Sequence, residues 1–207
     1  MSNSKLFDSW TLMPDGSLIR SAGEEDVNDI VRVLRLQGGE VSLYHVGPGD
    51  ILQRIHEFLI ASDAQGETIG CAAVRAVSAE VAELASLAVA PGSCGRDIGP
   101  TLIHECLQLA AARGFTRAWL ATRRPGYFKR IGFSAFSFYS LPLSVQLRKF
   151  AAVLRQPIGR WRYAVDGGFV FLEREVTGLF GLVRDRGAVC VAARAGASEG
   201  VRHRLTG

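Results

Sequence analysis

The hydrophobic pattern is clearest in the middle of the chain, where an apolar run leads into a glycine-rich turn and then an amphipathic stretch. Residues 84–89 are almost continuously apolar, which is typical of a buried strand. Gly92, Gly95 and Gly99 interrupt any regular element, and after Gly99 apolar residues recur at helical spacing. Such a turn presents backbone N–H groups at the positive end of a helix dipole, so the pattern predicts an anion-binding site.

The segments on either side predict a mixed sheet with helices on both faces. Strands are predicted at 17–20, 68–77, 84–89, 118–121 and 133–141. Helices are predicted after a capping box at Ser21 and Glu24, after a cap at Asp50, after Gly99, and at 126–130 and 144–154. Residues 58–61 fit either the end of the second helix or the start of a strand. Because adjacent strands alternate with crossover helices in this order, the fold class is α/β.

Composition narrows the classes of protein that this chain can represent. Its 207 residues, 48% of them hydrophobic, suffice for one domain with a sizeable core. No apolar run has the length of a membrane span, and the N-terminus lacks the apolar stretch of a signal peptide. The four cysteines, Cys71, Cys94, Cys106 and Cys190, are scattered without a C-x-x-C pair, which predicts a reduced, cytoplasmic protein with no metal site. The net charge of +4 suits an anionic cofactor, and no basic run interleaved with aromatic residues indicates nucleic acid as a partner.

The glycine spacing excludes two common phosphate-binding motifs. It is neither G-x-G-x-x-G nor a loop that ends in Gly-Lys-Ser/Thr. The stretch Val-Ala-Pro-Gly-Ser-Cys-Gly-Arg-Asp-Ile-Gly at 89–99 resembles the coenzyme A loop of the GNAT acetyltransferases, which begins Val-x-Pro and continues into a glycine-rich core. Gly95, Arg96, Ile98 and Gly99 fit that loop. Cys94 stands where the family usually has Arg or Gln, and Asp97 replaces a glycine.

A second motif supports the resemblance. Tyr-Phe-Lys-Arg-Ile-Gly-Phe at 127–133 looks like the late aromatic-x-x-x-x-Gly-Phe signature of the family. In detail the chain is most similar to the acetyltransferase domain of N-acetylglutamate synthases. The matching phrases lie at 19–20, 69–73, 82–89 and 120–133.

The resemblance covers residues 17–150 and implies a division of the chain. Residues 1–16 form a loose lead-in, 17–155 the acetyltransferase domain, and 156–207 a β-rich extension of unknown role. Strands are predicted in this extension at 161–165, 168–172 and 188–192. Three roles are open for the extension: it could extend the sheet, cover the acceptor pocket or form a dimer interface.

The resemblance implies acetyl-CoA as the acetyl donor and assigns residues to it. Backbone N–H groups of Leu87, Ala88 and Val89 would polarise the thioester carbonyl. The cofactor's phosphates would lie over the loop and the first helical turn, that is Cys94, Gly95, Arg96, Asp97, Ile98, Gly99 and Pro100. Asp97 places a negative charge near those phosphates and is the main departure from the family's loop.

The candidates for catalysis and acceptor binding also have alternative interpretations. Glu83 is the one carboxylate at the start of an apolar strand and is the candidate general base, as the resembled synthases have an acidic residue there. Its alternative is a strand-end glutamate that points to water. Arg123 could hold an acceptor carboxylate, or belong to a solvated basic turn. Arg20 is a weaker candidate. Phe128 occupies the position where many members have tyrosine, so no general acid is assigned and Tyr127 is interpreted as packing.

These observations predict an N-acetyltransferase that acts on a small, amino-acid-like primary amine. Two alternatives stay open: an inactive GNAT-fold binding module, and an acetyltransferase of protein amines. The expected partners are the small-molecule amine and, for a homodimer, a second copy of the chain. Neither nucleic acid nor a membrane is an expected partner.

Overall fold

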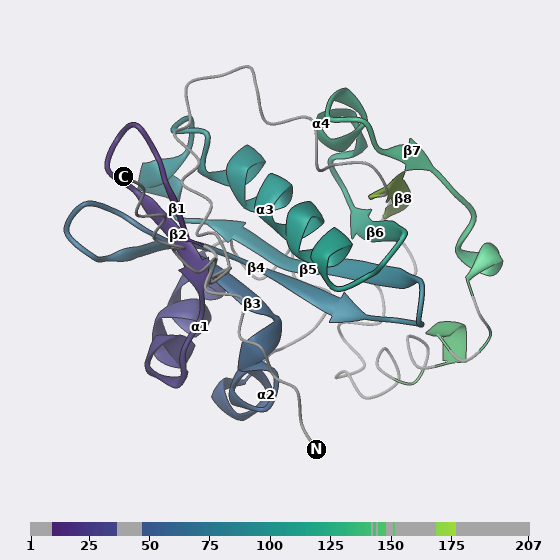
Figure 1. Cartoon of the computed structure of the whole chain (residues 1–207), viewed down its shortest axis with the longest axis horizontal. Coiled ribbons are helices and arrows are strands. Elements are labelled where there is room, and N and C mark those ends of the chain that lie inside the picture. The colour runs from purple at the N-terminus through teal and green to yellow at the C-terminus, as the bar shows by residue number, and fades with distance from the viewer. Residues whose placement is uncertain are drawn as a thin grey trace, which may run out of the picture.

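The structure is a computed structural model that describes residues 10–36, 47–141, 143, 145–147, 151 and 169–176. Eight strands form one mixed sheet in the order β1-β2-β3-β4-β5-β6-β8-β7, with helices against it (Figure 1). The strands are β1 (Trp10–Leu12), β2 (Leu18–Ser21), β3 (Phe58–Ser62), β4 (Thr68–Ala76), β5 (Val81–Val89), β6 (Arg117–Thr122), β7 (Ser134–Ala135) and β8 (Val170–Glu175). The helices are α1 (Val27–Leu36), α2 (Pro48–Leu52), α3 (Ile98–Ala112) and α4 (Pro125–Arg130). The predicted α/β mixed sheet is confirmed.

The direction of the strands follows from the connections between them. From β1 to β5 every neighbouring pair is antiparallel, while β5 and β6 are parallel. Helix α3 connects β5 to β6, and a crossover helix is what a parallel pair needs. β8 lies antiparallel between β6 and β7.

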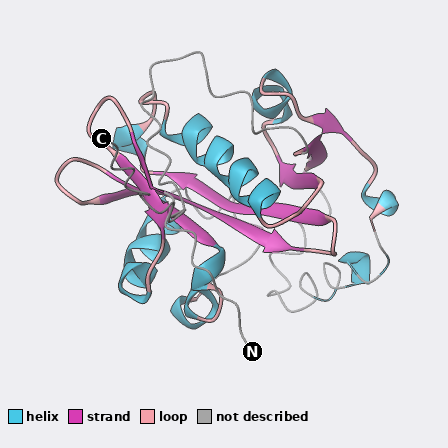
Figure 2. Cartoon of the chain, in the orientation of Figure 1, coloured by secondary structure: helices cyan, strands magenta, loops and turns pink. Residues whose placement is uncertain are grey.

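Helices cover both faces of the sheet, as Figure 2 shows, and β4 contributes a buried side chain to each face in turn. Cys71 and Ala73 belong to the hydrophobic cluster under α1 and α2. Ala72 and Val74 point the other way, into the larger cluster under α3. Burial on both faces explains why this strand is apolar at successive positions rather than at alternate ones.

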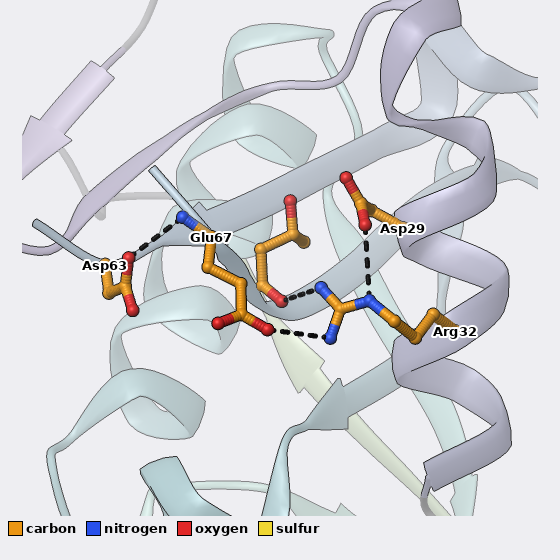
Figure 3. Close-up of polar contacts among 5 residues, drawn as sticks. Asp29, Arg32, Asp63 and Glu67 are labelled. Atoms are coloured by element: carbon orange, nitrogen blue, oxygen red, sulfur yellow. Dashed lines mark hydrogen bonds and ion pairs between the residues drawn. The ribbon is translucent and has the colours of Figure 1, made fainter. Parts of the chain in front are cut away.

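Helix α1 is tied to the β3–β4 hairpin by polar contacts (Figure 3). Arg32 donates to the Asp29 carboxylate at 3.2 Å, to the Glu67 carboxylate at 3.1 Å and to the Thr68 carbonyl at 2.9 Å. The Glu67 backbone N–H in turn donates to the Asp63 carboxylate at 2.9 Å, within the turn. Since the contacts span more than thirty positions of sequence, they fix the helix relative to the sheet.

Both predicted helix caps were wrong. Ser21 is the last residue of β2. Gly23 caps a 3₁₀ turn at Glu24–Asp26 that leads into α1, and its N–H donates to the Asp26 carboxylate at 2.7 Å. α2 begins after Gly47, whose N–H donates to Asp50 at 3.0 Å, so Asp50 lies inside the helix instead of before it. In both cases the first helical turn begins with a glycine N-cap and an acidic side chain three residues later that accepts its N–H.

Several predicted strands differ from the observed ones. Residues 10–12, expected in the lead-in, form β1 and pair with β2. Residues 58–61 belong to β3, so the strand alternative was correct. The strand predicted at 133–141 reduces to β7, followed by a 3₁₀ turn at Phe138–Ser140.

The strand predicted at 168–172 corresponds to β8, which extends the sheet beside β6. The division of the chain at residues 16 and 155 stays a prediction. The strands predicted at 161–165 and 188–192 lie outside the described residues, as does most of the helix predicted at 144–154.

Candidate active site

The candidate site lies where β5 and β6 separate. Their parallel ladder has only three residue pairs, from Val81–Arg117 to Glu83–Trp119. Beyond Glu83, β5 continues for six residues to Val89 while pairing with β4 alone among the described strands. The backbone of Leu87, Ala88 and Val89 therefore lies beside an opening in the sheet, which is where an extended ligand can meet a strand.

A β-bulge bends β5 within this opening. Residue pairs in the β4–β5 ladder run Cys71–Ala88 and then Ala73–Ala85, so β5 holds one extra residue. Ser86, inside the bulge, has a left-handed backbone with φ of 53°. Bulges of this kind redirect a strand and end its pairing.

The glycine-rich loop delivers the chain to the N-terminus of α3. Pro91–Ser93 forms one 3₁₀ turn, and Gly95 has φ of 86°, a conformation that glycine adopts without strain. Asp97 is the N-cap of α3 and has φ of 56°, which is unfavourable for a residue with a side chain. The first N–H groups of a fifteen-residue helix follow directly, so the local geometry suits an anion.

The charge of Arg96 is engaged away from this helix terminus. Its Nη2 lies 2.7 Å from a carboxylate oxygen of Asp15 and 3.1 Å from the hydroxyl of Ser17. Hydrogen bonds from Ser17, together with Arg96, hold the pKa of Asp15 below its usual range. Arg96 therefore bridges the loop to the β1–β2 turn, and its contact with phosphates stays a prediction.

Glu83 lies in the interior rather than at a wet strand end. It is 7% exposed, and its carboxylate is 3.7 Å from Nη1 of Arg75, its cross-strand partner. The Nε of Arg75 lies 3.4 Å from the carboxylate of Glu57, so one arginine is shared by two acids. Sequence reasoning missed Arg75 because only the β4–β5 register places it opposite Glu83.

The structure separates the two candidate acceptor arginines. Arg20 makes two hydrogen bonds to the Asp26 carboxylate, at 2.7 and 2.9 Å. This salt bridge joins β2 to the 3₁₀ turn that precedes α1. Arg123 follows β6 directly, and its guanidinium lies 4.7 Å from the centroid of the Phe169 ring. Four strand spacings separate β2 from β6, roughly 19 Å, so the two arginines do not form one site.

The late aromatic signature packs against the loop. Phe128 is buried and meets Tyr127 and Phe133 edge to face, at centroid distances of 5.1 and 5.8 Å. A Cβ on Gly99 would lie 3.6 Å from the Tyr127 hydroxyl, which places that hydroxyl at the start of α3. Burial, followed by the nearby charge of Asp97, raises the pKa of Tyr127 above its usual value. The aromatic spacing could not reveal this position, because it depends on how α4 packs on α3.

The described parts of the chain contain neither a cluster of metal ligands nor a membrane-spanning helix. No group of three or more His, Cys, Asp or Glu residues there could hold a metal ion. None of the helices in those ranges is long and apolar enough to cross a membrane.

A surface cavity of about 610 Å³ lies away from the candidate site, at the start of β6. It is lined by Arg117, Gly132, Ser134, Glu173, Arg174 and Glu175. Arg117 and Glu173 face each other at 3.5 Å, and Arg174 donates to the Ile131 carbonyl at 2.7 Å. These charged side chains pair with one another or with the backbone at this edge of the sheet. The cavity is therefore not part of the candidate site.

Residues 35–133 match the Acetyltransferase (GNAT) family, so this part of the chain is a GNAT acetyltransferase domain, and the protein is an acyltransferase. Its curated relatives include an uncharacterized N-acetyltransferase of Chlorobaculum tepidum, 29% identical over 115 residues, which are 56% of this chain and 74% of the relative. The amino-acid acetyltransferase of Mycobacterium tuberculosis is 26% identical over 119 residues, 56% of this chain and 68% of the relative.

Solved structures share the fold. An N-acetylglutamate synthase from Neisseria gonorrhoeae, complexed with coenzyme A and N-acetyl-glutamate, is 25% identical with a TM-score of 0.63, over 77% of this chain and 35% of that one. A Mycobacterium tuberculosis protein solved in complex with CoA and NLQ has the same TM-score of 0.63 at 22% identity, over 76% of this chain and 98% of that one.

The cysteines allow a direct check of the core and the loop. We expect iodoacetamide to label the exposed Cys94 in the native protein and to leave Cys71 and Cys106 unmodified until the protein unfolds. Burial raises the pKa of Cys71 to about 12 and raises that of Cys106 as well, so neither forms the reactive thiolate near neutral pH. Peptide mass mapping with and without denaturant measures each site. Native labelling of Cys71 or Cys106 would contradict the described packing.

Proposed function

We propose that this protein transfers the acetyl group of acetyl-CoA to the primary amine of a small, amino-acid-like acceptor. GNAT acetyltransferases use acetyl-CoA as their donor. The relatives named as amino-acid acetyltransferase and N-acetylglutamate synthase support the acceptor class. The observation that carries the proposal is the β5 strand, which leaves β6 after Glu83 and leads into a glycine-rich turn at the start of α3.

The donor fits this strand and turn. The amides at the N-terminus of α3 suit its phosphates, and the backbone of Leu87–Val89 suits its thioester carbonyl. Gly99 leaves room beside Val89 and Tyr127, where a larger side chain would intrude. Asp97 is the one element of the loop that opposes an anion.

Glu83 is the proposed general base. The amine nitrogen attacks the thioester carbonyl carbon, the C–N bond forms and the C–S bond breaks. The amine's proton passes to the carboxylate of Glu83, and the sulfur leaves as a thiolate that takes a proton from solvent. Glu83 lies four residues before Leu87, roughly 13 Å along an extended strand, so the proton reaches the carboxylate through bridging water.

Arg123 is the proposed contact for the acceptor's carboxylate. It follows the carboxyl end of β6, at the open side of the sheet, and its guanidinium stacks on Phe169. Arginine pairs with carboxylates through two parallel hydrogen bonds. Arg20 is not included in this proposal, because Asp26 already engages both of its terminal nitrogens.

The proposal is tested by measuring release of free coenzyme A with a panel of amines. The panel contains the free amino acids, the same amino acids amidated at the carboxyl group, and short peptides. Turnover with free amino acids and not with their amides would support the proposal and the carboxylate contact. Turnover with peptides alone would replace it with a protein acetyltransferase. No binding of acetyl-CoA by calorimetry would leave a non-catalytic member of the family.

Asp97 gives the donor site a specific prediction. We expect Asp97→Gly to bind acetyl-CoA about 10-fold more tightly, because it removes a charge that repels phosphates. It should also raise the melting temperature by about 2–4 °C, since glycine adopts the left-handed backbone without strain. Calorimetric titration and thermal unfolding measure the two effects.

Asp97→Asn is the matched control, because it removes the charge and keeps a side chain that tolerates this backbone conformation. It should share the gain in affinity and not the gain in stability. Weaker acetyl-CoA binding by Asp97→Asn would show that the carboxylate assists the donor.

A further inference from the structure

The bulge in β5 has a partner on the neighbouring strand. The extra residue of β5 falls between the pairs Cys71–Ala88 and Ala73–Ala85. Ser86 occupies the bulge with φ of 53°, a conformation that a residue with a side chain rarely adopts. Such a conformation persists where its surroundings hold it in place.

Cys71 contacts the backbone of that bulge. Its thiol donates to the carbonyl oxygen of Ser86, with 3.4 Å between sulfur and oxygen. Cys71 is also the cross-strand partner of Ala88, the residue where normal pairing resumes. The side chain that contacts the out-of-register residue therefore belongs to the residue paired with the end of the bulge.

The surroundings keep the thiol in its neutral, hydrogen-bonding form. Cys71 is fully buried in the cluster under α1 and α2, and burial raises its pKa to about 12. Ser86 is half-buried, and the extra residue of a bulge is left without its ladder partner. The –SH group donates to its carbonyl oxygen, which an aliphatic side chain cannot do.

We propose that Cys71 is a positioning residue whose thiol locks the β5 bulge and thereby holds the Leu87–Val89 backbone in place beside the opening to β6. The inference rests on the proposed function, since it takes this backbone to face the thioester. Cys71 itself touches neither donor nor acceptor. Its effect passes through Ser86, whose carbonyl oxygen accepts from the thiol.

Comparing Cys71→Ala with Cys71→Ser distinguishes the effect of hydrogen bonding from the effect of side-chain volume. Both are smaller than cysteine and nearly equal in size, but only serine can donate and accept. Cys71→Val fills the site and cannot hydrogen-bond, so it serves as a second variant should the alanine protein fail to fold. Cys106→Ala is the control, because Cys106 is an equally buried thiol on the α3 side of the sheet.

The first readout needs no cofactor. Amide hydrogen exchange of a peptide spanning residues 84–90 should be about fivefold to tenfold faster in Cys71→Ala and Cys71→Val than in wild type. Cys71→Ser should stay near wild type, and Cys106→Ala should leave this peptide unchanged. Equal exchange in wild type, Cys71→Ala and Cys71→Val would overturn the lock whatever the protein's activity.

The second readout follows the thioester. With acetyl-CoA labelled at the carbonyl carbon, we expect the wild-type protein to lower the carbonyl stretching frequency on binding, and Cys71→Ala to lose most of that shift. We expect kcat to fall about 10- to 100-fold while the Kd for coenzyme A stays near wild type. Cys71→Ser should restore both, and Cys106→Ala should lose stability without losing kcat.

The outcomes distinguish a failure of this inference from a failure of the proposed function on which it rests. An unchanged carbonyl shift and kcat in Cys71→Ala would overturn the positioning role while acetylation stands. Losses of kcat that follow melting temperature equally in Cys71→Ala and Cys106→Ala would also overturn it. A wild-type protein that binds no acetyl-CoA would overturn the proposed function and the catalytic part of this inference together, whatever the exchange experiment shows of the lock.

Discussion

Replacing Glu83 with glutamine is expected to lower kcat for acetyl transfer by about 10²- to 10⁴-fold. Glutamine keeps the shape of the side chain and its place beside Arg75, whose Nη1 lies 3.7 Å from the Glu83 carboxylate, but its amide cannot take the proton of the attacking amine. Binding of acetyl-CoA should change little, because the proposed donor site lies further along β5. Steady-state rates and calorimetric titration on the same preparation measure the two quantities.

Glu57→Gln is the matched control for that experiment. Glu57 contacts the same Arg75, at 3.4 Å, and it also lies partly buried, so the variant makes the same chemical change in the same network. We expect a small effect on kcat and a loss of stability similar to that of Glu83→Gln. If both variants retain wild-type kcat, Glu83 is not the base, and its pairing with Arg75 is structural.

Replacing Gly99 with glutamate is expected to weaken acetyl-CoA binding by about 100-fold or more. A Cβ at this position meets the Tyr127 hydroxyl at 3.6 Å and Val89 at 3.7 Å, so the longer side chain must leave toward the ligand's path. It also brings a negative charge to the positive end of α3, which opposes a phosphate there. Titration with acetyl-CoA measures the loss, and thermal unfolding checks that the protein is folded.

Gly92→Glu controls for the charge alone. Gly92 lies in the same loop, and a Cβ there meets nothing within 4 Å. Gly99→Ala controls for the side chain alone, since its methyl group makes only ordinary contacts. Both should bind acetyl-CoA nearly as well as wild type. Wild-type affinity in Gly99→Glu would place the donor elsewhere.

The network around Arg75 and the bulge at Ser86 suggest how β5 serves two purposes. Its first part is held on both sides, by β4 and by β6, and presents Glu83 in the interior. Its second part leaves β6 and is reshaped by the bulge before it reaches the loop. The strand is paired on both sides in its first half and redirected by the bulge in its second half. It therefore places a carboxylate and the backbone proposed to face the donor at a fixed separation.

Local features were predictable because they depend on residues close in sequence. Strand β5, the glycine turn and α3 follow from an apolar run, three glycines and helical spacing within about thirty residues. The buried position of Cys106 follows from the same helical spacing. The caps of α1 and α2 were misplaced because a glycine N-cap gives a weaker sequence signal than serine or aspartate.

The sequence by itself determined the class of fold, the family and the position of the candidate donor loop, since each depends on the spacing of residues close together in the chain. Tertiary structure alone decided which side chains meet. Arg96 turns to Asp15, 81 positions away, Arg75 faces Glu83 through the β4–β5 register, and Cys71 reaches the bulge at Ser86. Such contacts are set by strand register and by the packing of helices on the sheet, which depend on the whole buried core rather than on any one segment.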